Sequence, residues 1–544
     1  MRGSEHLHPF RLGHSIPRMH AGPEHVTVGL WLESWTQPAW RARALRLLRE
    51  RVNIQVAYVS LAAPPRPPAP ALNGLLRRLL QRDHRRALRF CADPFAPEDV
   101  RPLLEGVPVA SELAVPAGVD VLMQLGSAAP TPAHLAVAHF GLWRFDADPT
   151  HLLDGLPIGF WDVMGGRETV TTALRVQRQP GAPGLLIHRR TSATALGSVA
   201  HTAMQALWRQ AGDLAIAFGQ LAVLGPEVLD QLPAVPAIPA RAVPGTLRAA
   251  ALWARHTARV AGRWAALRGG RYQWHLLAAA SGDDPRGELD LGRYRPLLPP
   301  PDRLWADPFP VVHDGRTFVF IEEQLFAEPF GHVSVLELHP DRTLSTPRAV
   351  LRRPYHLSYP FVFRWAEQWY LLPESFDGGR LELLRAKHFP YEWETDRILL
   401  EEAVADATMA QIEGQWWMFA AKMPAPGLDC DELHLYRGPS PLGPWTAHPR
   451  NPVRRDVSTS RPAGRLVFHD GHWWRPVQDG SKRYGYAIRW HRILRLDDEG
   501  LEEDLGPVVL PVVRRGLLAV HTMNTADGVS LVDGLHLISR ERRE

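Results

Sequence analysis

The chain has 544 residues, of which 45% are hydrophobic and 22% are charged. This length predicts two or three domains, and this composition argues against a largely disordered protein. The formal net charge is +4 at pH 7, and the arginines that account for this excess are spread along the chain. They do not alternate with aromatic residues that could stack on bases, so no nucleic-acid partner is predicted. The two cysteines, Cys91 and Cys430, lie in different predicted domains, which argues against a disulfide framework and a cysteine-based metal site.

Residues 1–24 are predicted to form a flexible tail, because they contain histidine and arginine but no apolar core of signal-peptide length. No run in the chain reaches about 18 uninterrupted apolar residues, the length that a membrane-spanning helix needs. These observations favour a cytoplasmic protein. The arginine-rich composition favours a bacterial source with a GC-rich genome.

Residues 25–225 are predicted to form an α/β domain. Strand patterns and helical patterns alternate there, with strands over 26–31, 54–61, 119–125 and 141–145 and helices over 38–48, 131–139 and 193–224. This alternation is typical of a Rossmann-type unit. The proline-rich stretch 64–70 is predicted to be a loop or an insertion.

Residues 226–292 are predicted to contain a proline-rich linker, over 226–244, and then an amphipathic helix, over 246–267. One face of the helix carries the arginines Arg248, Arg255, Arg259 and Arg263. The other face is apolar apart from Thr257 and carries Trp253, Val260, Trp264 and Leu267. One interpretation is an interdomain helix that packs its apolar stripe on one domain. The alternative is peripheral contact with the inner face of a membrane.

A phrase recurs five times between residue 293 and the end of the chain. Its copies begin at Trp305, Ser358, Asp406, Ser460 and His521. An apolar run, a Gly or acidic turn and an aromatic run follow each of the first four copies, and Asp-Gly between such runs is a strong hairpin signal. A period near fifty residues that is built of hairpins is typical of propeller blades. Residues 293–544 are therefore predicted to form an all-β five-bladed β-propeller, with the phrase opening one strand of each blade.

Several motifs of this half carry a family resemblance. In chain order they include Trp305-Ala-Asp-Pro-Phe309, Ser358-Tyr-Pro-Phe361, Leu372-Pro-Glu-Ser375, Arg461-Pro-Ala-Gly464 and Arg475-Pro-Val-Gln-Asp479. Together they resemble the N-terminal domain of plant glucosamine inositolphosphorylceramide transferases and its bacterial relatives, which is similar to the propellers of arabinanase and β-xylosidase type glycosidases. The resemblance implies a propeller fold. In the plant enzymes the transfer chemistry belongs to a separate glycosyltransferase domain, whose pattern this sequence does not show.

Three acidic residues are predicted to be catalytic, because equivalent positions in radially arranged blades converge on one end of the central axis. Glycoside cleavage requires an acid and a base or nucleophile, with carboxyls about 5 Å apart in retaining enzymes and about 6.5–9.5 Å apart in inverting ones. The family resemblance implies that Asp307 is the general base. Glu374 and Asp406 would then serve as acid and as pKa-setting neighbour. The alternative is that all three are turn or strand-cap residues that hydrogen-bond the next blade.

Further polar residues are predicted to bind the substrate, namely Glu323, Arg461, Gln478, Asp479 and His521. Arginine and glutamine offer planar donors that suit sugar hydroxyls or an anionic group. The alternative is an inter-blade hydrogen-bond network. The histidines show no metal-ligand spacing, so no metal site is predicted.

The segments 141–148, 156–161 and 165–172 resemble the formyltransferase family that uses 10-formyltetrahydrofolate. The catalytic Asn and His of that family fall on Arg144 and Asp146, and its later Asp has no counterpart in 179–184. Formyl transfer needs an amide donor for the oxyanion and a positioned base. The resemblance therefore implies a formyltransferase-like domain that has lost catalysis, has no folate cofactor, and instead binds a sugar, a nucleotide-linked ligand or the propeller.

These patterns together predict a carbohydrate-active protein of glycan or glycolipid assembly, whose propeller binds or processes a glycoside at an acidic axial pocket. Its expected partner is a sugar or a glycolipid head group. One alternative is a non-catalytic protein that binds glycans or lipid head groups. A weaker alternative is a formyl- or acyltransferase that acts on a sugar. No cofactor is predicted, because the sequence has no glycine-rich phosphate loop of either standard spacing.

Overall fold

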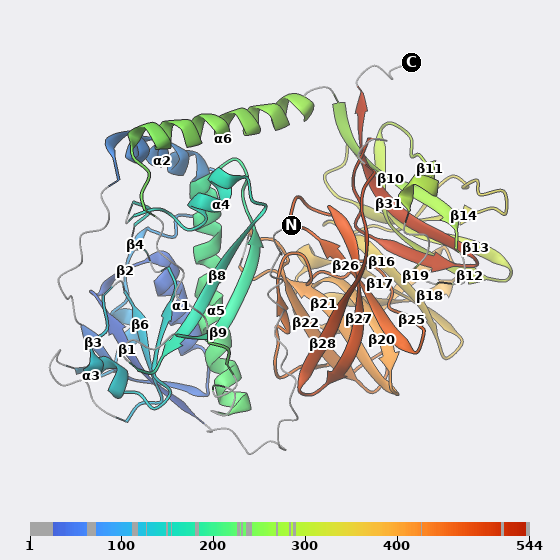
Figure 1. Cartoon of the computed structure of the whole chain (residues 1–544). Helices are drawn as coiled ribbons and strands as arrows, with labels where there is room; N and C mark the ends of the chain where they lie inside the picture. The colour runs from blue at the N-terminus through green and yellow to red at the C-terminus, as the bar shows by residue number, and fades with distance from the viewer. Residues whose placement is uncertain are drawn as a thin grey trace. The chain divides into compact units, whose positions relative to one another are not determined.

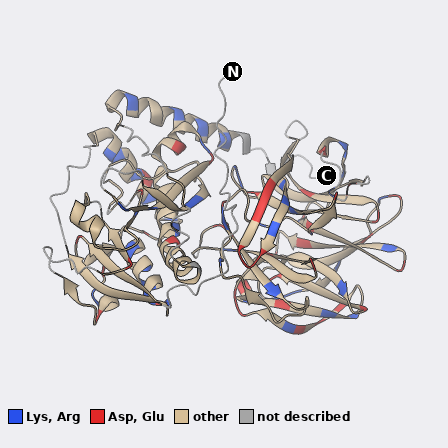
Figure 2. Cartoon of the chain, turned by 60° about the horizontal axis from the view of Figure 1, so that its bottom comes forward, with Lys and Arg blue, Asp and Glu red and all other residues tan. Residues whose placement is uncertain are grey.

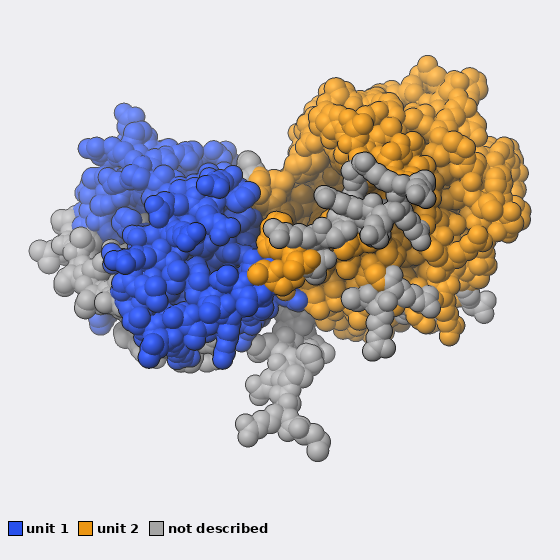
Figure 3. All heavy atoms as spheres, turned by 90° about the horizontal axis from the view of Figure 1, so that it is seen from above, with its two compact units in different colours: residues 1–260 blue, residues 261–544 orange. Residues whose placement is uncertain are grey.

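The computed structural model of the chain describes residues 25–539 apart from short gaps, which fall at 62–71, 111–117, 127, 148, 150, 154, 180–183, 226–228, 230–231, 235–241, 268–269, 282–283, 285, 287–289, 426 and 513–515. The predicted tail (1–24), the proline-rich loop (64–70) and much of the linker (226–244) lie outside the described residues. The chain divides into two compact units, residues 1–260 and 261–544 (Figures 1 and 3).

Unit 1 is built on a seven-stranded mixed sheet with the order β5-β3-β1-β6-β7-β8-β9. The strands are β1 (Val26–Leu32), β3 (Ile54–Leu61), β5 (Val109–Ala110), β6 (Val121–Leu125), β7 (Leu142–Phe145), β8 (Thr169–Gln177) and β9 (Leu185–Ala193), and the short pair β2 (Thr36–Pro38) and β4 (Pro97–Asp99) lies apart from the sheet. The first five strands of the order pair in parallel, whereas β8 and β9 pair antiparallel. The sheet agrees with the α/β prediction, while the Rossmann type and the formyltransferase likeness stay predictions.

Two helices cover one face of this sheet. The helices of unit 1 are α1 (Ala39–Arg49), α2 (Gly74–Ala87), α3 (Pro132–Ala136), α4 (Phe160–Gly165), α5 (Val199–Leu224) and α6 (Thr246–Leu267), the last of which continues into unit 2. Trp40 and Leu45 of α1 and Phe218 of α5 pack with Met123 and Trp143 of the sheet in one fully buried core. Burial of these side chains stabilises the unit by about 2 kcal/mol for each large residue. Among the described helices, none has the length and apolar character needed to cross a bilayer.

Helix α6 has the predicted bounds, but its arginines do not form one solvent-facing stripe. The guanidinium of Arg259 donates to the carbonyl oxygens of Met164 (2.7 Å) and Val163 (3.4 Å) at the end of α4. The guanidinium of Arg248 lies over the ring of Trp161, 5.3 Å from its centroid. Arg255 remains exposed, and Figure 2 marks the arginines in blue along the helix. Two of the four arginines therefore attach α6 to α4, which satisfies carbonyls that a helix C-terminus leaves free.

Unit 2 is a five-bladed β-propeller, as predicted. Five antiparallel sheets follow one another along the chain: β12–β15 (Arg303–His313, Arg316–Leu325, His332–Leu338, Arg348–Leu351), β16–β19 (Ser358–Trp365, Gln368–Glu374, Leu381–His388, Glu392–Leu400), β20–β24 (Ala405–Ile412, Gln415–Lys422, Glu432–Gly438, Thr446–Ala447, Arg454–Arg455), β25–β28 (Val467–His469, His472–Asp479, Ala487–Asp497, Gly500–Val509) and a fifth that combines both ends of the unit. The first strand of each of the first three sheets contains one copy of the repeated phrase, and the first strand of the fourth sheet follows its copy.

The fifth blade takes one strand, β10, from the segment 226–292 that the sequence prediction assigned to the linker and the amphipathic helix. Its order is β11-β10-β31-β29, with β30 also paired to β31, and its strands are β10 (Gly270–Ala280), β11 (Arg295–Leu297), β29 (Leu517–Ala519), β30 (Met523–Ala526) and β31 (Val529–Ser539). Strand β10 pairs with β31 along its whole length. The propeller therefore begins near residue 270 and not at 293. The physical reason is that β29, β30 and β31 do not complete the blade by themselves, so β10 and β11 come from the other end of the unit.

The repeated phrase forms the same irregularity in three successive blades. Asp307, Tyr359 and Asp406 have positive φ values of 50°, 43° and 53°, and the register of the innermost strand shifts around each of them. A non-glycine residue rarely takes this conformation, and it is rarest for a bulky side chain. A bulge of this kind redirects a side chain and ends regular pairing, so these three side chains are aimed at the centre of the ring.

Two side chains cross the axis and fill the centre of the propeller. The hydroxyl of Tyr359 in the second blade accepts a hydrogen bond from the backbone N–H of Gly464 in the fourth (2.7 Å) and lies 2.7 Å from Thr408 Oγ1 in the third. Arg465 in the fourth blade donates to the carbonyl oxygens of Pro310 (3.3 Å) and Val362 (2.6 Å) in the first and second. The centre of the ring is therefore a packed polar core, and a ligand site can only lie to one side of it.

Candidate functional site

Most of the residues that the sequence singled out in the propeller meet in one group, which we call the axial cluster. It consists of Asp307, Glu322, Glu374, Asp406, Arg461, Gln478, His521 and Asp533, and its members come from all five blades. Glu322 and Asp533 are members that the sequence analysis did not name. Glu323 and Asp479 were expected here, but their side chains bond elsewhere.

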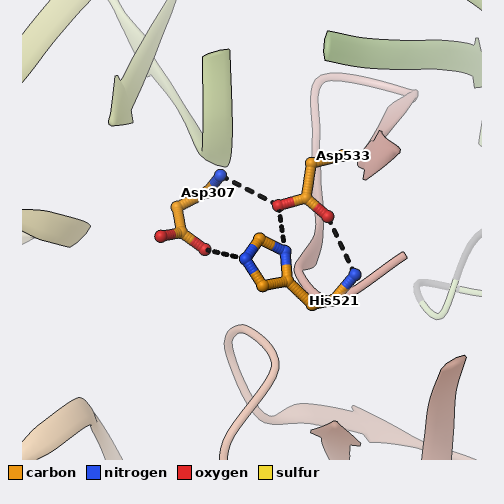
Figure 4. A group of neighbouring side chains, drawn as sticks. All are labelled: Asp307, His521 and Asp533. Atoms are coloured by element: carbon orange, nitrogen blue, oxygen red, sulfur yellow. Dashed lines mark hydrogen bonds and ion pairs between the residues drawn. The ribbon is translucent and has the colours of Figure 1, made fainter. Parts of the chain in front are cut away.

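His521 lies between two buried carboxylates, as Figure 4 shows. Its Nδ1 contacts Asp533 Oδ2 at 2.5 Å, and its Nε2 lies 3.9 Å from Asp307 Oδ1. Burial alone would lower the pKa of His521, but the charges of Asp533 and Asp307 outweigh burial and raise the pKa to about 9. At neutral pH the imidazole is therefore a cation held between two acids.

Asp307 is tied into the framework on both carboxylate oxygens. Oδ2 accepts the backbone N–H of Tyr359 (3.0 Å), and Oδ1 accepts the hydroxyl of Thr522. Its own backbone N–H donates to Asp533 Oδ2 (3.0 Å). Burial raises the pKa of Asp307 to about 6, although His521 acts in the opposite direction. The residue is ionised at neutral pH, and only 6% of its side chain is exposed.

Asp406 and Glu374 form the second half of the cluster around one arginine. Asp406 Oδ2 accepts from Arg461 Nε and from Gln478 Nε2 (3.0 Å), and Arg461 Nη2 lies 3.6 Å from Glu374 Oε2. Burial and then the Asp406 carboxylate raise the pKa of Glu374 well above its ordinary value, while Arg461 opposes the rise. Glu374 therefore keeps its proton to a higher pH than an ordinary glutamic acid does.

Glu322 is a functional candidate that the sequence analysis missed in favour of its neighbour. Successive residues of a strand point to opposite faces, and on β13 it is Glu322 that faces the cluster. Burial, with Asp307 adding to it, raises the pKa of Glu322 to about 8. Its Oε1 lies 3.4 Å from Nε2 of His356, whose Nδ1 accepts the backbone N–H of Gly331 (3.0 Å). Because Nδ1 accepts, the neutral ring carries its proton on Nε2, the nitrogen that lies nearest to Glu322.

Glu323 and Asp479 have structural partners away from the cluster. Glu323 accepts from Trp305 Nε1 (3.2 Å), Ser334 Oγ (2.7 Å) and Arg303 Nη1 (3.0 Å), all within the first blade. Asp479 accepts from Arg489 Nε (2.8 Å) and from the backbone N–H of Ser481 (3.0 Å). The bonds of both acids lie within their own blades, so neither acid joins the axial cluster or the inter-blade network that was the alternative.

Some members of the cluster are reachable by solvent, and others are not. The side chains of Glu322, Glu374 and Arg461 are 11%, 13% and 19% exposed, whereas that of Asp533 is fully buried. Trp274 stacks on the ring of His521 with centroids 4.2 Å apart, and Tyr484, which is largely exposed, lies edge-on to the same ring. An approaching ligand therefore meets two glutamic acids, an arginine and two aromatic rings before it meets the buried aspartates.

The arrangement offers both a protonated acid and an ionised base. Pairs of carboxyls whose environments drive their pKa values apart are typical of acid–base chemistry. Glu374 is a proton donor with partial access to solvent, and Asp307 is a carboxylate. However, the oxygens of Asp307 already accept hydrogen bonds from Tyr359 and Thr522. That engagement favours a positioning and electrostatic role for Asp307.

One group in the described part of the chain has the spacing of a metal site. Asp307, His521 and Asp533 each offer a ligand atom within 4.8 Å of the others. Nδ1 of His521 already bonds Asp533, and the pKa of His521 is raised, so the imidazolium supplies the positive charge that a cation would bring. The charge balance of this group is therefore met without a metal ion, and the absence of a metal site stays a prediction.

The positions that correspond to the formyltransferase catalytic pair lie at the end of β7 in unit 1, with Arg144 on the strand and Asp146 just after it. Arg144 and Asp146 are both exposed, and the carboxylate of Asp146 forms an ion pair with Arg175 on β8. Neither side chain offers the amide donor or the unpaired base that formyl transfer needs. The segment 179–184 lies largely outside the described residues.

Comparison with known proteins places a match on the propeller. Residues 299–521 match the family model described as glucosamine inositolphosphorylceramide transferase 1, N-terminal. The chain is 34% identical over 207 residues to glucosamine inositolphosphorylceramide transferase 1 of Oryza sativa subsp. japonica, which covers 37% of this chain and 28% of that protein. It is 29% identical over 249 residues to the Arabidopsis thaliana protein of the same name, covering 43% and 32% respectively. The chain thus spans about three tenths of the length of these curated relatives.

Solved structures with a similar chain trace include glycoside hydrolases. One is a family 117 glycoside hydrolase from the marine bacterium Zobellia galactanivorans, with 13% identity, a TM-score of 0.32, and coverage of 50% of this chain and 92% of that one. Another is a GH43 β-xylosidase/α-arabinofuranosidase from a compost metagenome, with 12% identity, a TM-score of 0.33, and coverage of 43% and 90%. Scores at this level carry no conclusion about activity. The curated relatives are plant proteins, so the matches lend no support to the expected bacterial source.

Proposed function

We propose that the axial cluster binds an amino sugar, as part of a protein that acts in glycan or glycolipid assembly. The observation that carries the proposal is the surplus of acid at a partly exposed site. Five carboxyl groups face two cationic side chains, Arg461 and His521. This surplus contributes to the high pKa values of Glu322 and Glu374, because each ionised neighbour disfavours a further negative charge.

A cationic ligand would neutralise part of this excess of carboxyl groups. An ammonium group beside Glu322 or Glu374 favours the ionised carboxylate and forms a charge-assisted hydrogen bond to it. Trp274 and Tyr484 offer aromatic surface at the same place, which suits the C–H face of a sugar ring. Arg461 and Gln478 hold Asp406 in place and leave the two glutamic acids to face the ligand.

The family match supports a carbohydrate ligand of this kind. The relatives are named for glucosamine and for inositolphosphorylceramide, and the match covers the segment that supplies most of the cluster. Because the chain spans only part of those relatives, the transferase activity of the whole plant proteins is carried over only as an expectation. We infer a sugar or a glycolipid head group as the ligand class.

Binding without turnover is the form of the proposal that the geometry favours. Hydrolysis needs a base with access to water, and Asp307 and Asp406 are almost fully buried with their oxygens engaged. A glycosidase-like activity is the second candidate, and the raised pKa of Glu374 favours it, because a carboxyl that keeps its proton can act as a general acid.

Calorimetric titration of the full chain with glucosamine, N-acetylglucosamine and glucose tests the binding form. Glucosamine is expected to bind at least about tenfold more tightly than the two neutral sugars, because only it carries the ammonium group. Its binding should release protons, which appears as a dependence of the heat on buffer ionisation. Glu322→Gln and Glu374→Gln should weaken glucosamine binding, whereas Glu328→Gln, at an exposed glutamate that pairs with Arg352, should not.

Equal affinity for all three sugars, or binding that is unchanged in both glutamine variants, would contradict the proposal. A turnover assay distinguishes the non-catalytic sugar-binding function from the glycosidase-like activity. Hydrolysis of a p-nitrophenyl glycoside that is abolished in Asp307→Asn and Glu374→Gln, with sugar binding retained, would establish the glycosidase-like activity. Binding that weakens in these variants with no hydrolysis in the parent protein supports the non-catalytic form.

A further inference from the structure

Helix α2 in unit 1 carries a continuous stripe of arginines on its solvent side. Arg78, Arg82 and Arg85, followed by Arg89 in the turn after the helix, are spaced by four, three and four residues, and all four are exposed. Residues at this spacing share one face of a helix. The opposite face, with Leu76, Leu80, Asp83 and Ala87, is buried. The stripe therefore lies opposite the side that attaches α2 to the rest of the unit.

No acid on α2 compensates these charges. Its single acidic residue, Asp83, lies on the buried face, where a carboxylate oxygen accepts the backbone N–H of Ala200 at 2.9 Å. Arg77 and Arg86 add two more exposed cations. Like charges four residues apart destabilise a helix, so the stripe lowers the stability of α2 when no partner is bound. A stripe that costs stability, on a helix fixed by Asn73 at its N-cap, points to an anionic partner.

Apolar side chains are exposed at both ends of the stripe. Phe90 and Leu88 follow the helix with exposures of 74% and 42%, and Leu75 in its first turn is 37% exposed. A combination of arginines with exposed aromatic and aliphatic side chains is typical of helices that lie at a lipid interface. The fourteen residues of α2 span about 21 Å, so the stripe is long enough to lie flat on a bilayer.

Helix α6 packs with α2 in one apolar cluster, but its charges are used differently. Arg259 donates to carbonyl oxygens of α4, and Arg248 lies over Trp161. The arginines of α2 have their head groups exposed instead. Arg255 and Arg263 of α6 are exposed as well, but α2 carries the denser row of exposed arginines, so the stronger basic surface is that of α2.

We propose that the arginine stripe of α2, formed by Arg78, Arg82, Arg85 and Arg89, docks unit 1 reversibly on an anionic lipid bilayer. The aliphatic Leu75 and Leu88 favour a lipid surface over a nucleic acid, because they offer nothing to phosphates or to base edges. Each arginine near such a surface strengthens binding about fivefold, and high salt weakens it. This inference does not depend on the sugar ligand proposed for the propeller.

Co-sedimentation of the full chain with vesicles tests the proposal, using phosphatidylcholine alone and phosphatidylcholine with phosphatidylserine. We expect binding only to the anionic vesicles and release of the protein at high salt. Changing Arg78, Arg82, Arg85 and Arg89 to Gln should weaken binding by several hundredfold, whereas changing all four to Lys should keep most of it. Phe90→Ser should weaken binding at every salt concentration.

A matched control removes the same charge from unit 2. Arg364, Arg385, Arg397 and Arg437 are exposed but face acids, and their change to Gln should leave vesicle binding unaltered. Circular dichroism should show that all variants keep their helix. The proposal is overturned if the α2 variant sediments like the parent, if neither protein binds anionic vesicles, or if the same variant instead loses affinity for a single-stranded oligonucleotide that the parent binds.

Discussion

The hydroxyl oxygen of Tyr359 accepts a hydrogen bond from the backbone N–H of Gly464, 105 residues away and two blades further round the ring. This bond joins the second and fourth blades directly across the axis. Thr408 of the third blade contacts the same oxygen at 2.7 Å. A single buried hydroxyl thus couples three blades beneath the axial cluster, and the positions of Asp307 and Asp406 depend on that coupling.

Tyr359→Phe is expected to destabilise the propeller by about 1–3 kcal/mol, because it leaves a buried N–H and a buried hydroxyl without their partner. Urea unfolding followed by tryptophan fluorescence measures the loss. Tyr370→Phe is the matched control, since Tyr370 packs on Phe363 and its hydroxyl has no hydrogen-bond partner among the described residues. A loss of equal size in the control would contradict the role assigned to the Tyr359 hydroxyl.

Glu322→Gln is expected to stabilise the protein at high pH and to have little effect near pH 4. The pKa of Glu322 is about 8 in the folded protein and about 4.3 in an unfolded chain. Between these values the folded state holds a proton that the unfolded state has lost, so the free energy of unfolding falls as the pH rises. The glutamine removes a penalty on the order of a few kcal/mol. Denaturant unfolding at several pH values measures it.

The adjacent Glu323 should behave in the opposite way. Hydrogen bonds from His332, Ser334, Arg303 and Trp305 overcome the effect of burial and lower its pKa to about 2. Its contribution to stability is present above the unfolded pKa and is lost as the pH falls through about 2. Glu323→Gln should therefore destabilise the protein at neutral pH. Shifts of the same sign in both variants would show that the two faces of β13 are wrongly assigned.

His521 and Asp533 are expected to be strongly coupled. Replacing either one leaves a buried charge without its partner, which costs about 3–5 kcal/mol. His521→Ala combined with Asp533→Asn should cost less than the sum of the single changes, as a double-mutant cycle in urea would show. The exposed pair His388 and Glu392, with Nδ1 and Oε2 2.9 Å apart, should give a coupling below about 1 kcal/mol.

Arg259→Ala should loosen helix α6 from unit 1. The change removes the donors to the carbonyls of Met164 and Val163 and costs about 1–2 kcal/mol locally. Hydrogen exchange is the sensitive measurement, because amides of 249–260 should lose protection while those of the propeller keep it. Arg255→Ala, at an exposed position one turn earlier, should leave exchange unchanged.

The repeat in the sequence was enough to predict the propeller, because three of its five copies mark a bulge with the same backbone conformation. Asp307, Tyr359 and Asp406 share that position. The fifth blade was predicted incompletely, because its outer strands lie before the first copy and carry no repeat. Only pairing of β10 with β31, far apart in the chain, reveals them.

For the candidate site, the sequence did not specify which individual residues face the axis. Strand alternation allows only one residue of an adjacent pair to face the axis, and on β13 this residue is Glu322. On β26 the same rule separates Gln478, which bonds Asp406, from Asp479, which bonds Arg489. Asp533 was missed although it offered a signal, namely an acid within the apolar run of the last strand.

The shared fifth blade also has a consequence for biosynthesis. Strand β10 leaves the ribosome about 250 residues before its partner β31, as the pairing of Ala280 with Val529 shows. At about 5–20 residues per second, it waits roughly 10–50 s with an unpaired edge. Four blades can form in that interval, but the ring stays open until translation is nearly finished. The nascent chain is then most exposed to aggregation, so chaperone dependence should centre on the last stage of synthesis.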